Sequence, residues 1–174
     1  MNLYLRLLWL FLRLPWLPKH TDPFTETILK MRVMPNDLDI YLHVNNGRYL
    51  TLMDLGRMHL IAVSGLLKPL RQKGWAPLLG SIKVHFVRSL KIFEKFTQTT
   101  QVIYWDEKWI YIEQKIFKGE QLYVVALMRM LFISKQGKVP PQEVLNLLPN
   151  PPAAPPIPNR VLHWQDAEKA TKEG

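Results

Sequence analysis

The chain has 174 residues, which fits one domain with a proper core and leaves little for a second. Hydrophobic residues make up 48% and charged residues 21%, which is typical of a globular rather than a disordered protein. There is no cysteine, so disulfides, thiolate metal sites and a cysteine nucleophile are excluded. The formal charge of +9 fits an anionic partner, either a membrane face, a small anionic ligand or nucleic acid, and the alternative is that it only keeps the protein soluble. We expect no nucleic-acid partner, because the cations are scattered and no nucleic-acid-binding motif is present.

Residues 1–17 read MNLYLRLLWLFLRLPWL and are apolar apart from Arg6 and Arg13. These arginines are seven residues apart, so on a helix they lie on nearly the same face. The apolar run between them is too short for a membrane span or for the core of a signal peptide. The pattern predicts an interfacial helix whose arginines face lipid phosphates, in a cytoplasmic protein that contacts a membrane peripherally. The alternative is that the segment packs on its own domain or on a second subunit.

The folded domain is expected to begin near Phe24, after this N-terminal segment of residues 1–19. The stretch 25–33, TETILKMRV, alternates between apolar and polar side chains and predicts a strand. Residues 46–63 follow a loop, and their apolar positions recur at helical spacing around most of the circumference. This pattern predicts a long helix that is buried on most sides.

After a loop expected at residues 68–75, alternation predicts four further strands. They are joined by short turns at 106–107 and 118–120, which indicates antiparallel neighbours. The strand that reads QLYVVALMRMLFI is apolar on both faces, which indicates a central position in the sheet. The expected domain covers residues 20–138, followed by a proline-rich extension of residues 139–174. Residues 160–174 are expected to form a short helix or a loose tail at its periphery.

The predicted order is one strand, one long helix and four antiparallel strands. A single helix and a single curled sheet can bury each other, which gives an α+β fold. This order is the hotdog arrangement, in which a sheet of about five strands wraps around the helix.

The motif with the most chemical content spans residues 35–49 and reads PNDLDIYLHVNNGRY. It places Asp39, His43 and two asparagines in one loop and the first helical turn that follows. Backbone N–H groups at a helix start have no intrahelical acceptor, so they can stabilise negative charge that develops on a carbonyl oxygen. A carboxylate in a partly buried loop beside them can act as a general base or a nucleophile.

This motif resembles the signature of the hotdog thioesterases, including 4-hydroxybenzoyl-CoA and plant acyl-carrier-protein thioesterases. The resemblance implies that Asp39 and His43 are the catalytic residues. It also implies that Asn45, Asn46 and Gly47 contact the substrate, with the amide near Asn46 polarising the thioester carbonyl. The plant enzymes have an asparagine where this chain has Tyr41, which weakens a three-residue scheme copied from them.

The implied substrate is an acyl-CoA or an acyl-ACP, no cofactor or metal is expected, and the family's sites imply a homodimer or a dimer of dimers. Several alternatives stay open from the residues. Asp39 can serve only to order the loop through its hydrogen bonds, as we expect for Asp37, and Asn45 and Asn46 can serve only as helix caps. The chain could also be a non-catalytic acyl-binding protein or an enoyl-thioester hydratase. It has no Gly-x-Ser-x-Gly motif, and its histidines are dispersed, which argues against serine and metal hydrolases.

Overall fold

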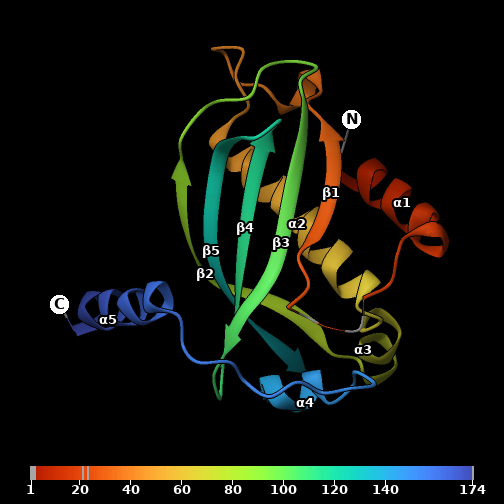
Figure 1. The fold of residues 1–174 in the computed structure, drawn as a ribbon, viewed down its shortest axis with the longest axis vertical. Coiled ribbons are helices and arrows are strands. Elements are labelled where there is room, and N and C mark those ends of the chain that lie inside the picture. Colours follow the sequence, from red (N-terminus) through yellow and green to blue (C-terminus); the bar gives the residue numbers. More distant parts are fainter. Residues whose placement is uncertain (1–2, 21, 23, 174) are drawn as a thin grey trace.

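The computed structural model describes residues 3–20, 22 and 24–173, and its central feature is a long helix inside the curl of an antiparallel sheet (Figure 1). The helix is α2, Asn46–Val63, at the bounds that the sequence predicts. The sheet runs in the order β1-β3-β4-β5-β2, with a short β6 beside β5. The strands are β1 Thr27–Arg32, β2 Ala76–Phe86, β3 Lys95–Trp105, β4 Ile110–Lys118, β5 Gln121–Ser134 and β6 Gly137–Val139. The α+β hotdog fold is therefore confirmed.

The strands follow the predicted alternation and turns. In β1, Thr27, Leu29 and Met31 face the core, while Lys30 and Arg32 are exposed. The strand β5 is internal and mostly buried, as its two apolar faces predict, because β4 and β2 flank it and side chains cover both of its faces. The two outer strands of the path are β1 and β2, so the sheet has two edges.

Three segments differ from the sequence-based expectation. Residues 68–75 are not a simple loop, because they contain most of the helix α3, Leu67–Lys73, which ends at Gly74 with a left-handed φ of 67°. The proline-rich stretch contains the short helix α4, Pro141–Leu145, whose Val144 is fully buried. The helix α5, Asn159–Glu173, places Val161 and Trp164 against Tyr111 and Ile103 of the sheet, so its first half is not peripheral. Prolines end helices readily, but apolar residues of this C-terminal segment still pack against the core.

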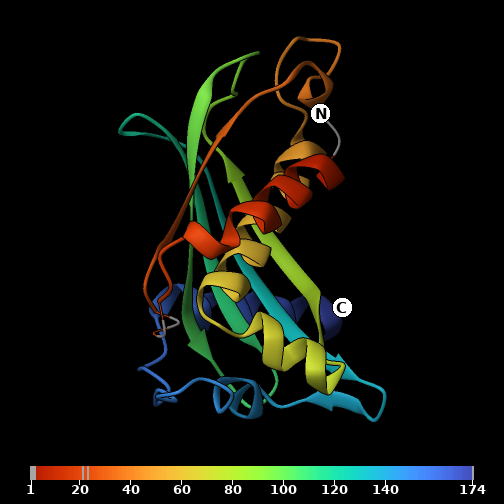
Figure 2. The same cartoon turned by 90° about the vertical axis from the view of Figure 1, so that its right-hand side faces the viewer.

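The N-terminal segment forms α1, Leu3–Arg13, followed by a 3-10 turn, η1, Leu14–Trp16. Figures 1 and 2 show α1 beside β1 and lying across α2. Residues 1–2 of the predicted segment lie outside the described residues. Within the part of the chain that the structure describes, no single helix has the length and apolarity to cross a bilayer.

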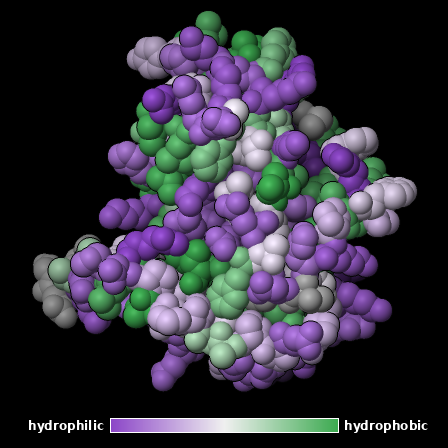
Figure 3. All heavy atoms as spheres, viewed as in Figure 1, coloured by the Kyte–Doolittle hydropathy of each residue, from purple (hydrophilic) through white to green (hydrophobic). Residues whose placement is uncertain are grey.

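The outer face of the sheet is shown in Figure 3. Polar and charged side chains cover most of it, and hydrophobic side chains gather in separate patches. The division of the chain at residues 19 and 138 remains a proposal. The contacts of α4 and α5 show that the C-terminal segment shares the core of the domain.

Candidate active site

The motif loop lies at one end of the sheet, against the loop that joins β2 to β3 (Figure 1). Short backbone bridges pair Leu38 with Val44 and His43 with Lys91. The Val44 N–H also donates to the Leu90 carbonyl at 3.0 Å. Backbone hydrogen bonds therefore hold the motif loop on both sides, independently of its side chains.

Asp39 is partly buried at the base of this loop. Its Oδ1 accepts hydrogen bonds from the backbone N–H groups of Tyr41 at 2.9 Å and His43 at 3.3 Å. Its own N–H donates to the His43 carbonyl at 2.8 Å. In the described part of the chain, Asp39 Oδ2 has no hydrogen-bond partner. The loop thus orients the carboxylate through one oxygen and leaves the other available.

The tip of the loop is exposed and apolar. Ile40, Tyr41 and Leu42 are 88%, 75% and 70% exposed. Leu42 has a left-handed φ of 60°, a conformation that costs a leucine energy and that the bridge from Asp39 to His43 maintains. A loop that presents three large apolar side chains beside a carboxylate suits contact with a substrate or with a second subunit.

The helix start follows directly. Asn45 is the N-cap of α2, and its side-chain oxygen accepts from the Gly47 N–H at 2.9 Å. The N–H groups of Arg48 and Tyr49 donate to the Asn45 carbonyl. Within the described residues, the Asn46 N–H is the one amide of this turn without an acceptor. The first turn of α2 therefore offers one free N–H donor, at Asn46, the residue near which the family resemblance places such a donor.

The other predicted residues take different places. His43 is half-buried and contributes its backbone to the loop bridges. Asn45 acts as a cap, as its alternative interpretation predicts. Asn46 and Gly47 are exposed at the helix start, and a side chain at position 47 would lie 3.2 Å from Asn45 Oδ1. The structure brings Asp39, His43 and the helix start into one loop and one helical turn.

The cluster around Asp37 was not predicted from the sequence. Its carboxylate is fully buried and accepts from Arg6 Nη2 of α1 at 2.5 Å and from Arg48 Nε of α2 at 2.7 Å. It also accepts from the Met34 N–H at 2.8 Å, and its carbonyl accepts from the Asn45 N–H at 3.0 Å. Asp37 therefore orders the loop, as expected, but it does so mainly through two ion pairs. The expectation that Arg6 faces lipid phosphates is wrong, because Asp37 holds it inside the protein.

A tyrosine fixes the second loop. Leu90 donates its backbone N–H to the Tyr49 hydroxyl at 2.8 Å, which ties the loop between β2 and β3 to the first turns of α2. Burial raises the pKa of the Tyr49 hydroxyl, so it stays protonated at neutral pH. Among the described residues, no group of three or more His, Asp or Glu side chains could hold a metal ion.

Comparisons with known proteins identify the family. A family model described as the thioesterase-like superfamily matches residues 33–165. The chain is similar to Protein THEM6 of Xenopus laevis, at 30% identity over 90% of this chain and 78% of that protein. It is also similar to a probable thioesterase of Saccharomyces cerevisiae, at 26% identity over 70% of this chain and 54% of that one.

Solved structures share the fold at low identity. The YbaW probable thioesterase from Escherichia coli aligns with a TM-score of 0.60 at 22% identity, over 71% of this chain and 98% of that one. The SAV2348 protein from Staphylococcus aureus, solved in complex with CoA, aligns with a TM-score of 0.61 at 15% identity, over 71% of this chain and 81% of that one. At these identities the matches show a shared fold.

The two aspartates of the motif are expected to differ in what they stabilise. Asp37→Asn removes the charge that two guanidinium groups share in a buried site, so it should lower the free energy of unfolding by about 3–5 kcal/mol. Asp39→Asn keeps an oxygen that can accept the two loop N–H groups, so its loss should stay below about 1 kcal/mol. Urea denaturation of both variants measures the difference, and equal losses would contradict the assignment.

Proposed function

The chain belongs to the thioesterase-like superfamily and is a thioester hydrolase, and we propose that it hydrolyses acyl-CoA with Asp39 as general base or nucleophile. One observation carries the assignment of the base. The loop fixes Asp39 through Oδ1, leaves Oδ2 unbonded, and leads into a helix start with a free Asn46 N–H. A base and an electrophilic donor are the two groups that thioester hydrolysis requires.

In the proposed reaction, Asp39 Oδ2 accepts a proton from a water molecule, and the water oxygen attacks the acyl carbon. The carbonyl oxygen gains negative charge, which the Asn46 N–H and the positive end of α2 stabilise. The C–S bond then breaks, and the proton held by Asp39 passes to the departing thiolate. In the nucleophile alternative, Asp39 attacks the acyl carbon itself, and water then hydrolyses the mixed anhydride. His43 and Gly47 line the same loop and turn and are proposed to contact the thioester.

The choice of CoA as the carrier has two supports. The formal charge of +9 suits a ligand with several phosphates. The structural neighbour SAV2348 was solved with CoA bound. An acyl-ACP is the competing substrate, and a direct comparison of the two thioesters separates them.

The activity test concerns Asp39 first. Replacing a general base typically lowers the rate by about 100- to 10,000-fold, so Asp39→Asn should lower kcat/KM for a good acyl-CoA by that factor. His43→Ala should have a smaller effect, and Asp37→Asn should retain activity once its folded fraction is taken into account. A folded Asp39→Asn enzyme within about threefold of wild type would fall far below the expected loss. Hydration of an enoyl thioester without hydrolysis would also contradict the proposal.

We further propose that the chain forms a homodimer through β2. The two sheet edges differ, because α1 lies beside β1 while the edge of β2 is open (Figure 2). Leu78, Leu79 and Phe86 are exposed on β2, and the exposed loop tip of residues 40–42 lies at the end of the sheet where β2 finishes. An open edge with apolar side chains favours pairing with another copy of the chain.

Sedimentation velocity tests this assembly. Wild-type protein at micromolar concentration should sediment as twice its 20.5 kDa mass, with larger species if dimers pair. Leu78→Glu should shift the population toward monomer, because it places a charge on the open edge. The matched control is Leu162→Glu on α5, another exposed leucine, which should leave the dimer intact. An active wild-type monomer would rule the dimer out.

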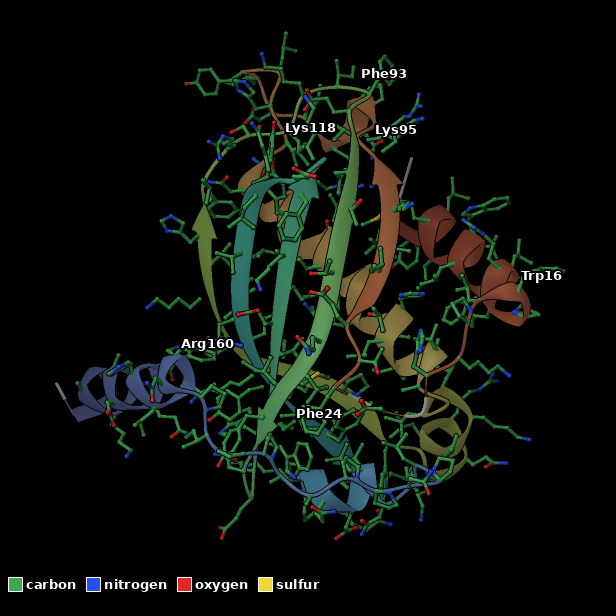
Figure 4. The ribbon with its side chains drawn as sticks, viewed as in Figure 1. Trp16, Phe24, Phe93, Lys95, Lys118 and Arg160 are labelled. Carbon is green, nitrogen blue, oxygen red and sulfur yellow. The ribbon has the colours of Figure 1, made fainter. Side chains whose placement is uncertain are left out.

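We also propose that α1 contacts a membrane. Arg6 and Leu10 face the protein, while Tyr4, Leu5, Leu8, Trp9 and Leu12 of α1 and Trp16 of η1 are 54–81% exposed. Figure 4 shows Trp16 projecting from the far end of this segment. Apolar and aromatic residues on an exposed helix face, in a chain of positive charge, suit the interface of an anionic bilayer.

Co-sedimentation with vesicles of phosphatidylglycerol and phosphatidylcholine tests this contact. Burying one leucine contributes about 1.5–3 kcal/mol, so Leu8→Glu should weaken vesicle binding at least tenfold. It should leave hydrolysis of soluble acyl-CoA near the wild-type rate, since Leu8 points away from the loop. Leu162→Glu is the control for added negative charge. Equal vesicle binding by Leu8→Glu and wild type would reject the membrane contact.

A further inference from the structure

A groove of about 770 Å³ lies between α1 and β1, and the motif loop from Leu38 to Asn45 does not line it. This volume is in the range of about 300–1,000 Å³ that is usual for ligand sites. The groove follows β1, whose six residues at about 3.3 Å each give it a length of about 20 Å. It is therefore long enough for an extended chain.

One part of the groove is apolar. Its lining includes Trp9 and Leu10 of α1, Leu29 of β1, Phe96 of β3 and Leu55 of α2. These side chains come from four different elements, so the site exists only because α1 is docked against the domain. A hydrocarbon chain placed here would exchange contact with water for contact with apolar side chains, which is favourable.

The other part is cationic. The groove is lined by five Arg and Lys side chains and by no Asp or Glu. Arg32 and Lys95 are directly opposite each other in the register of β1 and β3, an arrangement of like charges that is unfavourable without a counter-ion. Neither has an ion-pair partner in the described part of the chain. Lys118, at the same upper end of the sheet in Figure 4, is already paired with Glu94.

Arg6 lines the same groove and connects its two parts. Its side chain is 7% exposed, and its Nη2 bonds both Asp37 and the Arg32 carbonyl. Its Nη1 is buried and has no acceptor among the described residues. A buried donor without an acceptor is unfavourable, so an anion nearby would be stabilising.

We propose that this groove binds a single-chain amphiphile with an anionic head. The hydrocarbon chain lies along the apolar part of the groove beside the exposed Trp9 and Ile28, and the head is held by Arg32 and Lys95. The proposal rests on the proposed function in one respect, because thioester hydrolysis releases a carboxylic acid of this chemistry. A free fatty acid and a lysophospholipid both have this form, so both are tested.

An acidic peptide added to the edge of β1 is the competing occupant. The observations favour the amphiphile for a physical reason. The Arg32 carbonyl at this edge already accepts a hydrogen bond from the Arg6 guanidinium, so it is not free to pair with a further strand. In addition, α1 places apolar side chains where a further strand would need hydrogen-bonding groups.

Isothermal titration of the full chain with oleate, below its micelle-forming concentration, tests the groove. Removing two charges that contact an anionic head should weaken binding about tenfold, so Arg32→Gln/Lys95→Gln should show that loss. The control Lys83→Gln/Lys135→Gln has the same net charge and alters exposed residues outside the groove, so its affinity should match wild type. Octanoate should bind more weakly than oleate, and methyl oleate should not distinguish the two double variants. A parallel titration with oleoyl lysophosphatidate identifies the preferred head.

The outcome separates this site from the active site. Asp39→Asn should lose hydrolysis and still bind oleate with wild-type affinity. The catalytic role of Asp39 and the binding of oleate in the groove can therefore fail independently of each other. Equal oleate affinity in Arg32→Gln/Lys95→Gln and its control would overturn the groove proposal. Binding of an acidic peptide in place of oleate would overturn it as well.

Discussion

The Asp37 carboxylate is the point on which the arrangement of this protein depends. It is fully buried, and three parts of the chain meet at it, because Arg6 comes from α1, Arg48 from the first turn of α2, and the Met34 N–H from the segment that follows β1. A buried charge is tolerated only when ion pairs and hydrogen bonds compensate the lost hydration. These three parts of the chain must therefore hold their positions together. The motif loop that carries Asp39 starts one residue after this anchor, which is why its backbone can be rigid while its tip is exposed.

Much of the fold could be predicted because its sequence patterns are local. The alternation in β1, the helical spacing of α2 and the short turns of the later strands depend on neighbouring residues, and the structure confirms them. The placement of Arg6 could not be predicted, because its partner Asp37 is 31 residues away and nothing in the apolar segment of residues 1–17 indicates this ion pair. The helix α4 and the core contacts of α5 were missed for a related reason. Prolines and charges dominate their sequence, and single apolar residues such as Val144 and Trp164 are buried only because the sheet supplies a surface for them.

The candidate site could be predicted only in part. The motif indicated the loop and a helix cap at Asn45 or Asn46, because capping chemistry is local, while the amide near Asn46 was implied by the family resemblance. It could not distinguish the roles of Asp37 and Asp39, since both are aspartates that can bond nearby backbone N–H groups. Burial separates them in the structure. Asp37 has no exposed surface and two cationic partners, whereas Asp39 is partly exposed, bonds only two loop amides and keeps one oxygen free.

The helix α1 has two faces with different consequences. Its inner face positions Arg6 at Asp37 and closes one wall of the groove, and its outer face presents leucines and aromatic residues to the surroundings. Both faces belong to one element of 11 residues, and the Arg6–Asp37 ion pair joins this element to the start of the motif loop. Removing Arg6 would leave the Asp37 charge only partly compensated. The exposed residues of the outer face take no part in this ion pair, so a substitution such as Leu8→Glu can change the surface of α1 while Asp37 keeps both cationic partners.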